Sequence, residues 1–517
     1  MALCMIHCFA LVFLIDFTSS GRVLWKLKER TLAVHEQRTK QLVMLTNAAQ
    51  LLEGQIHQSL DHFNRKDLNT FKQRFIVNEA FWQQPDGPVF LYIGGEGPLS
   101  KFSVLAGHHV AMAEKHRALL VALEHRFYGS STVPGGLEVI NLQHLSSQQA
   151  LADLAAFHGY IGQKYGLTDK NIWISFGGSY AGALSAWFRG KFPHLVYGAL
   201  ASSAPIQATL DFSAYNKVVG CSLSDESVGG SKKCESSVRK AFAVLETALL
   251  GGNETQVVRD FACCELPKIP EDRLELVQSL ADIFMGSVQY NEEGVMLTIA
   301  QICDVMTNQS QEQEEEGEAY DRLVKLAKMY RALTQESCLD ISHEHAIHNL
   351  NKTTGTSSGY RQWFYQTCTE FGFYQTCEDA SCPFSRMLTL QFQTQLCLLL
   401  FGIPQHTVRR NIDFTNQYYG GGKPQSQHVL YINGDIDPWK ELSIVYNRTS
   451  VDQDRAVLIR SAAHCADMNP TYARDRPSLR QARKEIERRV ATWLRRAARE
   501  QSAWSDIIAQ PKGPVPL

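Results

Sequence analysis

The sequence has almost no net charge. Its 51 lysines and arginines are balanced by 53 aspartates and glutamates, which leaves a formal charge of −2 over 517 residues. A protein that binds nucleic acid neutralises phosphates with a surplus of basic side chains. We therefore expect no nucleic-acid partner. The composition, 44% hydrophobic and 20% charged, is that of a globular protein of one or two domains.

Long apolar runs are missing beyond the first residues. The segment QLCLLLFGI at 395–403 comes nearest, and it falls well short of the ~18 apolar residues that a membrane-spanning helix needs. We therefore expect no stable membrane insertion. At the amino-terminal end, an apolar core at 8–15 is followed by small residues at 18–21. This pattern predicts a secretory signal peptide at 1–20, although a charged start is missing, and a buried helix is the alternative.

Cysteine is missing between residues 8 and 221. Two of the 13 cysteines lie in the predicted signal peptide, and the other eleven lie between Cys221 and Cys465. This clustering predicts disulfides in the second half of the chain and an oxidising compartment such as the secretory pathway. Because eleven is odd, we expect one free cysteine, with Cys465 as the candidate. Four sequons predict glycosylation at Asn253, Asn308, Asn351 and Asn447.

Signatures of a metal or a cofactor are missing as well. The segment GGEG at 94–97 does not have the spacing of a dinucleotide-binding loop. In SHEHAIH, at 342–348, His345 and His348 have the spacing of a ligand pair on a helix, but the segment is not H-E-x-x-H and no carboxylate-rich shell follows. We expect neither a cofactor nor a metal site.

The chain does contain short apolar segments that alternate with helical patterns. Such segments predict a parallel sheet covered by helices on both faces. They lie at 88–93, 119–124, 171–176 and 198–205, and return at 428–434 and 456–464. Between them the pattern is helical and rich in loops. The predicted fold class is α/β, with a large helical cap inserted in the sheet domain.

This pattern divides the chain into six parts. We expect a signal peptide at 1–20, then an amino-terminal segment at 21–54 that could be a propeptide. The sheet domain follows in two parts, at 55–205 and at 406–506, with a disulfide-rich cap at 206–405 between them. A flexible tail is expected at 507–517.

The stretch FGGSYAGALSAW at 176–187 directly follows a predicted strand. A strand, Gly-x-Ser-x-small and a helix form the pattern of a nucleophile elbow. Gly177 and Ala181 leave room for the tight turn, and the helix amino terminus favours developing negative charge. We predict that Ser179 is a nucleophile, although the last motif position is Ala181 instead of glycine. A glycine-rich turn with an incidental serine is the alternative.

A nucleophilic serine needs a base and a group that orients the base. Asp435 and Asp437 follow one late strand, and His464 follows the next. The order serine, acid, histidine is that of α/β-hydrolases. His464 must be neutral to accept the serine proton, and we expect burial to lower its pKa from about 6.5.

Acyl transfer also needs donors for the oxyanion. The amide of Tyr180 follows the serine, and Gly94 or Gly95 could supply a second amide from the loop after the strand at 88–93. A tight turn without this function is the alternative for that loop.

Eight segments together resemble the family of prolyl carboxypeptidase and dipeptidyl peptidase II. They are LDHFN (60–64), TFKQRFIVNEAFW (70–82), GGEG, EHRFYGSS (124–131), GGSYAG, ASSAPI (201–206), WFYQTCTEFGFY (363–374) and NGDIDPW (433–439). The resemblance implies an α/β-hydrolase with a helical cap and a serine peptidase that uses Ser179, Asp437 and His464. It selects Asp437 because the family's aspartate precedes a Pro-Trp pair, and it leaves Asp435 as a turn residue.

The resemblance also implies a substrate. Relatives cut after proline at a chain end, so Trp439 and Phe371 would form the wall of a flat apolar pocket. Core packing is the alternative for both. Ala183 stands where related exopeptidases carry a larger residue, which would widen the pocket. Glu370 would bind a substrate's amino terminus, or else pair with Arg361.

The expected partners are therefore peptides, and the resemblance suggests endosomal or lysosomal processing, including for antigen presentation. Secretion and a homodimer stay open. Two other functions share the predicted site: a lipase or esterase, and a non-catalytic binding protein on a hydrolase scaffold.

Overall fold

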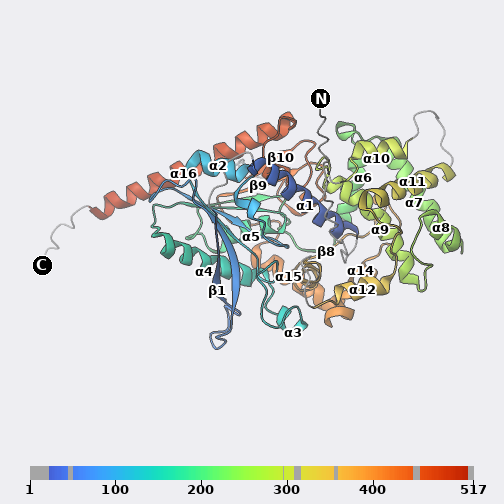
Figure 1. Ribbon diagram of the computed structural model, residues 1–517, viewed down its shortest axis with the longest axis horizontal. Helices are drawn as coiled ribbons and strands as arrows, with labels where there is room; N and C mark the ends of the chain where they lie inside the picture. Colours follow the sequence, from blue (N-terminus) through green and yellow to red (C-terminus); the bar gives the residue numbers. More distant parts are fainter. Residues whose placement is uncertain are drawn as a thin grey trace, which may run out of the picture.

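A mixed eight-stranded sheet forms the centre of one half of the molecule (Figure 1). The computed structural model describes residues 23–44, 51–294, 296–307, 316–353, 359–445 and 455–509. The strands of the sheet are β1 (Leu51–Ser59), β2 (Thr70–Asn78), β3 (Val89–Ile93), β4 (Leu119–Leu123), β5 (Trp173–Gly178), β6 (Gly198–Ser202), β9 (Val429–Gly434) and β10 (Ala456–Ile459). Their spatial order is β1-β2-β4-β3-β5-β6-β9-β10. Antiparallel pairing joins β1 to β2 and β2 to β4, and all other neighbours pair parallel.

The central strands are apolar on both faces because helices cover both faces. Along β3, Val89, Leu91 and Ile93 pack into one hydrophobic cluster and Phe90 packs into the other. The first cluster includes α4 (Ser147–Tyr165) and α5 (Tyr180–Lys191), and the second includes α2 (His108–His116) and α16 (Pro477–Ala509). This three-layer arrangement confirms the predicted fold class.

A helical region, which we call the cap, is inserted in the chain between β6 and β9 and forms the other half of Figure 1. It also contains a small parallel sheet of β7 (Thr209–Asp211) and β8 (Gly372–Tyr374). Its helices are α6 (Ser213–Leu223), α7 (Lys232–Leu250), α8 (Glu254–Asp260), α9 (Pro270–Gln289), α10 (Ile299–Met306), α11 (Glu316–Thr334), α12 (His343–Leu350), α13 (Tyr360–Gln366), α14 (Leu390–Phe401) and α15 (Gln405–Tyr419).

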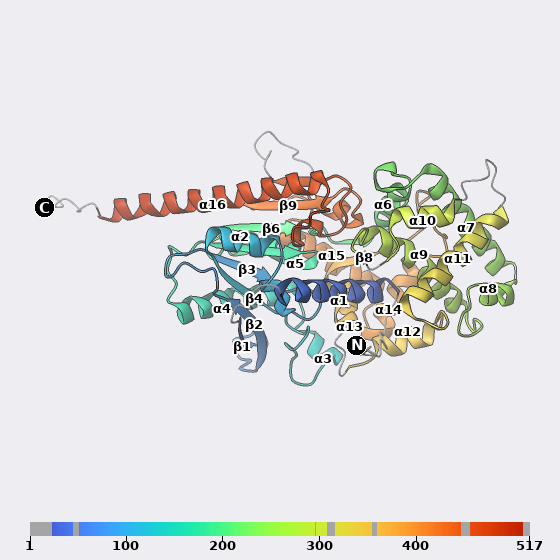
Figure 2. The same cartoon turned by 45° about the horizontal axis from the view of Figure 1, so that its top comes forward.

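Helix α1 (Val23–Met44) runs along the boundary between the sheet half and the cap (Figure 2). It packs against α9 of the cap and against η1 (Lys101–Val104) of the sheet half. A short helix, α3 (Val139–Leu142), lies in the sheet half. Two elements of the sheet half extend beyond the residue ranges expected from the sequence. β1 begins at Leu51, inside the amino-terminal segment expected at 21–54, and α16 ends at Ala509, beyond the expected end of the sheet domain at 506.

Four disulfides lie in the cap, as the clustering of cysteines predicts. They join Cys234 to Cys303, Cys264 to Cys338, Cys368 to Cys397 and Cys377 to Cys382. The expectation of one free cysteine was wrong, because Cys221 and Cys263 are free as well as Cys465. Eleven cysteines require only that the number of free thiols be odd, and three free thiols meet this requirement as well as one.

Candidate active site

Ser179 lies at the turn between β5 and α5. Its backbone has φ 59° and ψ −130°, a conformation that costs energy for any residue with a side chain. The turn is fixed by its hydrogen bonds, because the Ser179 amide donates to Ser202 O at 2.9 Å and the Ser179 carbonyl accepts from Ala183 N at 3.1 Å. The geometry is that of a nucleophile elbow, which presents the serine hydroxyl beyond the end of the strand.

Two glycines make this turn possible. A Cβ atom at Gly177 would lie 2.1 Å from Ala181 O, and one at Gly182 would lie 2.7 Å from Ser202 O. Both contacts involve backbone atoms that cannot move aside. Gly182 therefore provides the space beside β6 although the last motif position itself is Ala181.

Asp437 and His464 are brought together from the ends of β9 and β10. His464 Nδ1 donates to Asp437 Oδ2 at 2.9 Å, and Asp437 is completely buried. Asp437 also begins a short 3-10 helix, where its Oδ1 accepts from the Trp439 amide at 3.1 Å. With Nδ1 donating, Nε2 of the neutral ring is the nitrogen that can accept a proton. Asp435 belongs to the preceding turn, where its amide donates to Ile459 O at 3.0 Å.

Ser179 and His464 line the same cavity, whose volume is about 270 Å³. Among the described residues no hydrogen bond joins the Ser179 hydroxyl to His464. Such contacts are often long in a site without substrate and shorten when the substrate binds.

The pKa of His464 is shifted in the direction opposite to the expectation from sequence. Burial alone would lower it, but the negative charge of Asp437 and the hydrogen bond to this carboxylate raise the pKa well above its usual value. The sequence interpretation was wrong here because it weighed burial without the charge that the fold places 2.9 Å from the ring.

The two glycines that we considered as oxyanion donors differ in whether the backbone amide is already hydrogen-bonded. The Gly94 amide donates to Leu123 O at 2.9 Å, so it is already engaged in the sheet. Gly95 faces the elbow instead, because a Cβ atom there would lie 3.4 Å from Ala181 Cβ. The Tyr180 amide starts α5 and has no carbonyl of its own helix to bond. Tyr180 and Gly95 are therefore the better-placed pair.

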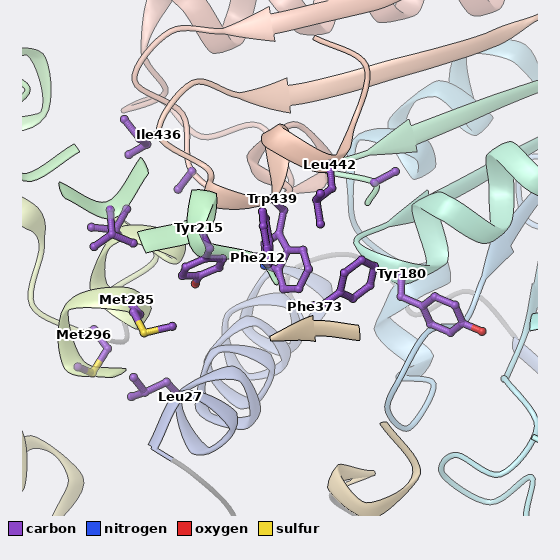
Figure 3. Close-up of a cluster of buried hydrophobic side chains, with 14 of the residues drawn as sticks. Leu27, Tyr180, Phe212, Tyr215, Met285, Met296, Phe373, Ile436, Trp439 and Leu442 are labelled. Carbon is purple, nitrogen blue, oxygen red and sulfur yellow. The ribbon is translucent and has the colours of Figure 1, made fainter. Parts of the chain in front are cut away.

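An aromatic cavity of about 140 Å³ adjoins Ser179. Trp439, Phe373 and Trp363 line it, and the rings of Phe373 and Trp439 meet edge to face with centroids 5.3 Å apart (Figure 3). Trp439 Nε1 donates to Gln289 Oε1 at 3.0 Å, which fixes the indole. Aromatic rings form one part of the cavity wall, and charged side chains such as Glu96, Lys28 and Asp282 form another.

Two residues expected in the pocket do not line it. Phe371 is buried behind Phe373, where its ring stacks at a centroid distance of 5.6 Å. The chain turns at Gly372, whose φ is 71°, and Phe373 lines the cavity instead of Phe371. Ala183 is completely buried within α5 and likewise lies outside both cavities.

Glu370 is also away from the cleft. It is buried, and it accepts hydrogen bonds from the Ser147 amide at 2.9 Å, the Ser147 hydroxyl at 2.6 Å and Gln366 Nε2 at 3.0 Å. Burial raises its pKa. Arg361 donates to backbone carbonyls of Leu137 and Leu350 instead. Neither a substrate amine nor Arg361 is the partner of Glu370, because the amino-terminal end of α4 occupies it.

A buried hydrogen-bond network, absent from the sequence interpretation, holds the ring of Tyr180. His125 Nδ1 donates to Arg126 O at 2.7 Å, so His125 Nε2 accepts from the Tyr180 hydroxyl at 3.0 Å. Burial lowers the pKa of His125 to about 4, which keeps the ring neutral. Gln366 then donates to the Tyr180 oxygen at 3.0 Å and accepts from the Tyr128 hydroxyl at 2.7 Å. Long-range partners such as these leave no local pattern in a sequence.

The remaining site predictions fall in three groups. Asn253 and Asn351 are exposed, whereas Asn308, Asn447 and the predicted signal peptide lie outside the described residues. Within the described ranges, no cluster of three or more His, Cys, Asp or Glu side chains could hold a metal ion. No helix in the same ranges is long and apolar enough to span a membrane.

The fold and the elbow define an α/β-hydrolase: a largely parallel sheet, a strained serine after β5, and an acid and a histidine after the last two strands. The chain belongs to the serine carboxypeptidase S28 family, whose sequence model matches residues 58–486. It is therefore a serine-type peptidase, and the resemblance found in the sequence is confirmed.

Individual relatives cover most of the chain. Thymus-specific serine protease of Mus musculus is 41% identical over 455 residues, which are 87% of this chain and 89% of the relative. The protein of the same name from Homo sapiens is 41% identical over 453 residues, 87% of this chain and 88% of the relative. Lysosomal Pro-X carboxypeptidase of Mus musculus is 29% identical over 456 residues, 84% of this chain and 88% of the relative.

Proposed function

We propose that the protein hydrolyses peptide bonds near a chain end, with Ser179 as nucleophile, His464 as general base and acid, and Asp437 as the group that orients His464. The observation that carries this proposal is the buried hydrogen bond between Asp437 and His464, in one cleft with the elbow serine. A lipase or esterase would share this geometry, but the family assignment favours a peptidase.

In the proposed reaction, His464 Nε2 takes the proton of the Ser179 hydroxyl as its oxygen attacks the scissile carbonyl carbon. The carbonyl oxygen becomes an oxyanion and accepts hydrogen bonds from the amides of Tyr180 and Gly95. His464 then gives its proton to the leaving amine, which leaves an acyl-enzyme. Water, activated by His464, attacks the ester and releases the acid and the free serine.

We further propose a preference for proline before the scissile bond. The flat pocket of Trp439, Phe373 and Trp363 suits a proline ring, which has no amide hydrogen to satisfy. The name of one relative, Pro-X carboxypeptidase, agrees with this preference. Disulfides in the cap and the word lysosomal in that name support a place in the secretory pathway or the lysosome. There the protein would process peptides, including those for antigen presentation.

Digestion of a mixed peptide library tests the proposal. Mass spectrometry should find cleavage after proline near chain ends by the wild type and none by Ser179→Ala. A control, Ser222→Ala, changes a buried serine of the cap that lies away from the cleft, and this protein should cut normally. Labelling by a fluorophosphonate probe should follow the same pattern. Cleavage of short-chain esters without peptide cleavage would contradict the proposal.

A further inference from the structure

Helix α1 faces the cleft at Ser179. Trp25 and Lys28 line the aromatic cavity, and Lys28 and His35 line the cavity that holds His464. In Figure 2 the helix lies along the junction of the sheet half and the cap. A peptide that reaches the serine must therefore pass beside α1.

Lys28 forms an ion pair inside this cleft. Its Nζ donates to Glu96 Oε1 at 2.9 Å and to the carbonyl oxygen of the same residue at 3.1 Å. The ammonium also lies 4.0 Å from the centroid of the Trp25 ring. Two oxygens and an aromatic face form the kind of cage that binds ammonium ions.

The carboxylate of Glu96 is built into the cleft. Glu96 follows Gly95, the candidate oxyanion donor, and lines both cavities beside Ser179. Its side chain is only 11% exposed. Burial alone would raise its pKa, but the charge of Lys28, together with hydrogen bonds from Lys28 and the backbone, holds the pKa below its usual value. Glu96 is therefore a fixed negative charge close to the reacting atoms.

Lys28 and Glu96 belong to different parts of the chain. The family match begins at residue 58, so Glu96 lies within the region that family members share and α1 lies before it. Helix α1 makes other polar contacts as well: the Leu24 amide donates to the buried Asp282 at 3.0 Å, and His35 pairs with Glu293 at 2.7 Å. Farther from the cleft, Lys26 pairs with Glu336, and these side chains are 27% and 24% exposed. The region matched by the family model thus supplies the carboxylate, and the segment before it supplies the ammonium.

A lysine side chain and the amino terminus of a peptide present the same group, a primary ammonium ion. We propose that Glu96 is the subsite for the ammonium group of a substrate's amino terminus, and that Lys28 occupies this subsite as an internal competitor. This inference rests on the proposed function, because it names the end of the peptide that the cleft recognises. It also assigns to Glu96 the role that the sequence suggested for Glu370.

Binding measurements test the subsite without any chemistry. The full-length protein carrying Ser179→Ala is titrated by calorimetry with the peptide Ala-Pro-Ala-Ala and with its N-acetyl form. In combination with Lys28→Ala, the Kd of the free-amine peptide should fall roughly tenfold, while that of the acetylated peptide should stay constant. Lys28→Met serves as a second variant that keeps most of the packing of the side chain.

Two matched controls sharpen the test. Lys26→Ala removes an ammonium from the same helix outside the cleft and should change neither Kd. Glu96→Gln should abolish the preference for the free amine, whereas Glu336→Gln should retain it. The same Kd for both peptides in the Lys28→Ala protein, or a preference that survives Glu96→Gln, would overturn the inference.

Kinetics separate this inference from the proposed function. In the active protein, Lys28→Ala should lower KM for the free-amine peptide with kcat unchanged. If the wild type cuts proline peptides but Lys28→Ala leaves KM unchanged, the subsite fails and the peptidase stands. If fluorophosphonate does not label Ser179 while the calorimetric preference for the free amine appears, the proposed chemistry fails and the subsite stands.

Discussion

The two halves of the molecule are stabilised in different ways. One apolar cluster extends from the sheet half into the cap, but all four disulfides of the described residues lie in the cap alone. The sheet half holds Ser179, Asp437 and His464, while the cap contributes Phe373 and other walls of the aromatic cavity. The positions of Ser179, Asp437 and His464 therefore depend on close backbone packing in the sheet half. The cap walls of the aromatic cavity depend on an insertion that is cross-linked by disulfides.

The largest effect should come from the backbone of the elbow. Gly177→Ala places a Cβ atom 2.1 Å from Ala181 O, so the turn cannot form, and we expect no measurable peptidase activity or probe labelling. The matched control is Gly159→Ala in α4, where nothing lies within 4 Å of the new atom. The control should keep full activity and gain about 0.5–1 kcal/mol of stability in urea unfolding. An active Gly177→Ala protein would contradict the assigned turn.

The next effect separates the two aspartates. Asp437→Asn removes the charge that orients and stabilises protonated His464, and we expect kcat/KM to fall by about 10³–10⁴-fold. Asp435→Asn changes a turn residue and should cost less than tenfold. Steady-state kinetics on a proline-containing peptide would measure both, and equal losses would refute the role given to Asp437.

A smaller effect concerns pH. His464 accepts the serine proton only when neutral, and its raised pKa means that acid protonates it early. Activity should therefore rise from acid to neutral pH, with kcat/KM at pH 7.5 at least about thirtyfold above that at pH 5. A pH profile with an acid limb below about 6.5 would contradict the raised pKa. The raised pKa of His464 also predicts that kcat/KM in an acidic lysosome is only a fraction of its value at neutral pH.

On the cap side, the network behind Tyr180 should matter less. Gln366→Leu removes a hydrogen bond to the Tyr180 hydroxyl and leaves Tyr128 without its acceptor. We expect kcat to fall about tenfold, because the elbow amide loses support, with KM nearly unchanged. Gln366→Glu restores the acceptor for Tyr128 but places a second carboxyl group against Glu370 and loses the donor to Tyr180, so it should not recover the loss. A change confined to KM would instead place Gln366 in substrate binding.

The smallest effect on activity should come from a single disulfide. Replacing Cys264 and Cys338 by serine opens a link that spans 74 residues, which should cost the cap about 4 kcal/mol of unfolding free energy. Hydrogen exchange should rise in α7 and α11 but not in β3 or β5, and activity should stay within threefold at 25 °C. Cys221→Ser, which changes a free thiol, is the control. Uniform exchange across both halves would show that they unfold as one unit.

The sequence predicts most of the sheet half and less of the cap. Buried strands such as β5 and β9 have dense apolar runs and were found, as was the elbow, because glycine spacing and turn geometry are local properties. β1 and β2 were missed as strands, since β1 lies at the sheet edge and buries little beyond Ile56 and Gln58. An edge strand with a half-polar pattern gives a weak periodic signal.

The sequence predicts the arrangement of Ser179, Asp437 and His464 from their order in the chain, and their catalytic roles stay a prediction. It does not predict contacts with distant partners. Ser179, Asp437 and His464 follow strands in the expected succession, so topology brings them to one edge. Glu370, Phe371 and the pKa of His464 depend on which groups pack against them from elsewhere in the fold. The pair of Lys28 and Glu96 joins α1 to the loop after β3, and no spacing rule connects them.

The insertion of the cap between β6 and β9 has a consequence for biosynthesis. The ribosome adds Ser179 before the cap and His464 only after it. At about 5–20 residues per second, the nascent chain therefore carries Ser179 without His464 for roughly 15–60 s. Until residue 464 has been added, the growing chain therefore cannot assemble the proposed set of Ser179, Asp437 and His464. A transcript cut short anywhere within the cap would give a product that can never cleave a peptide.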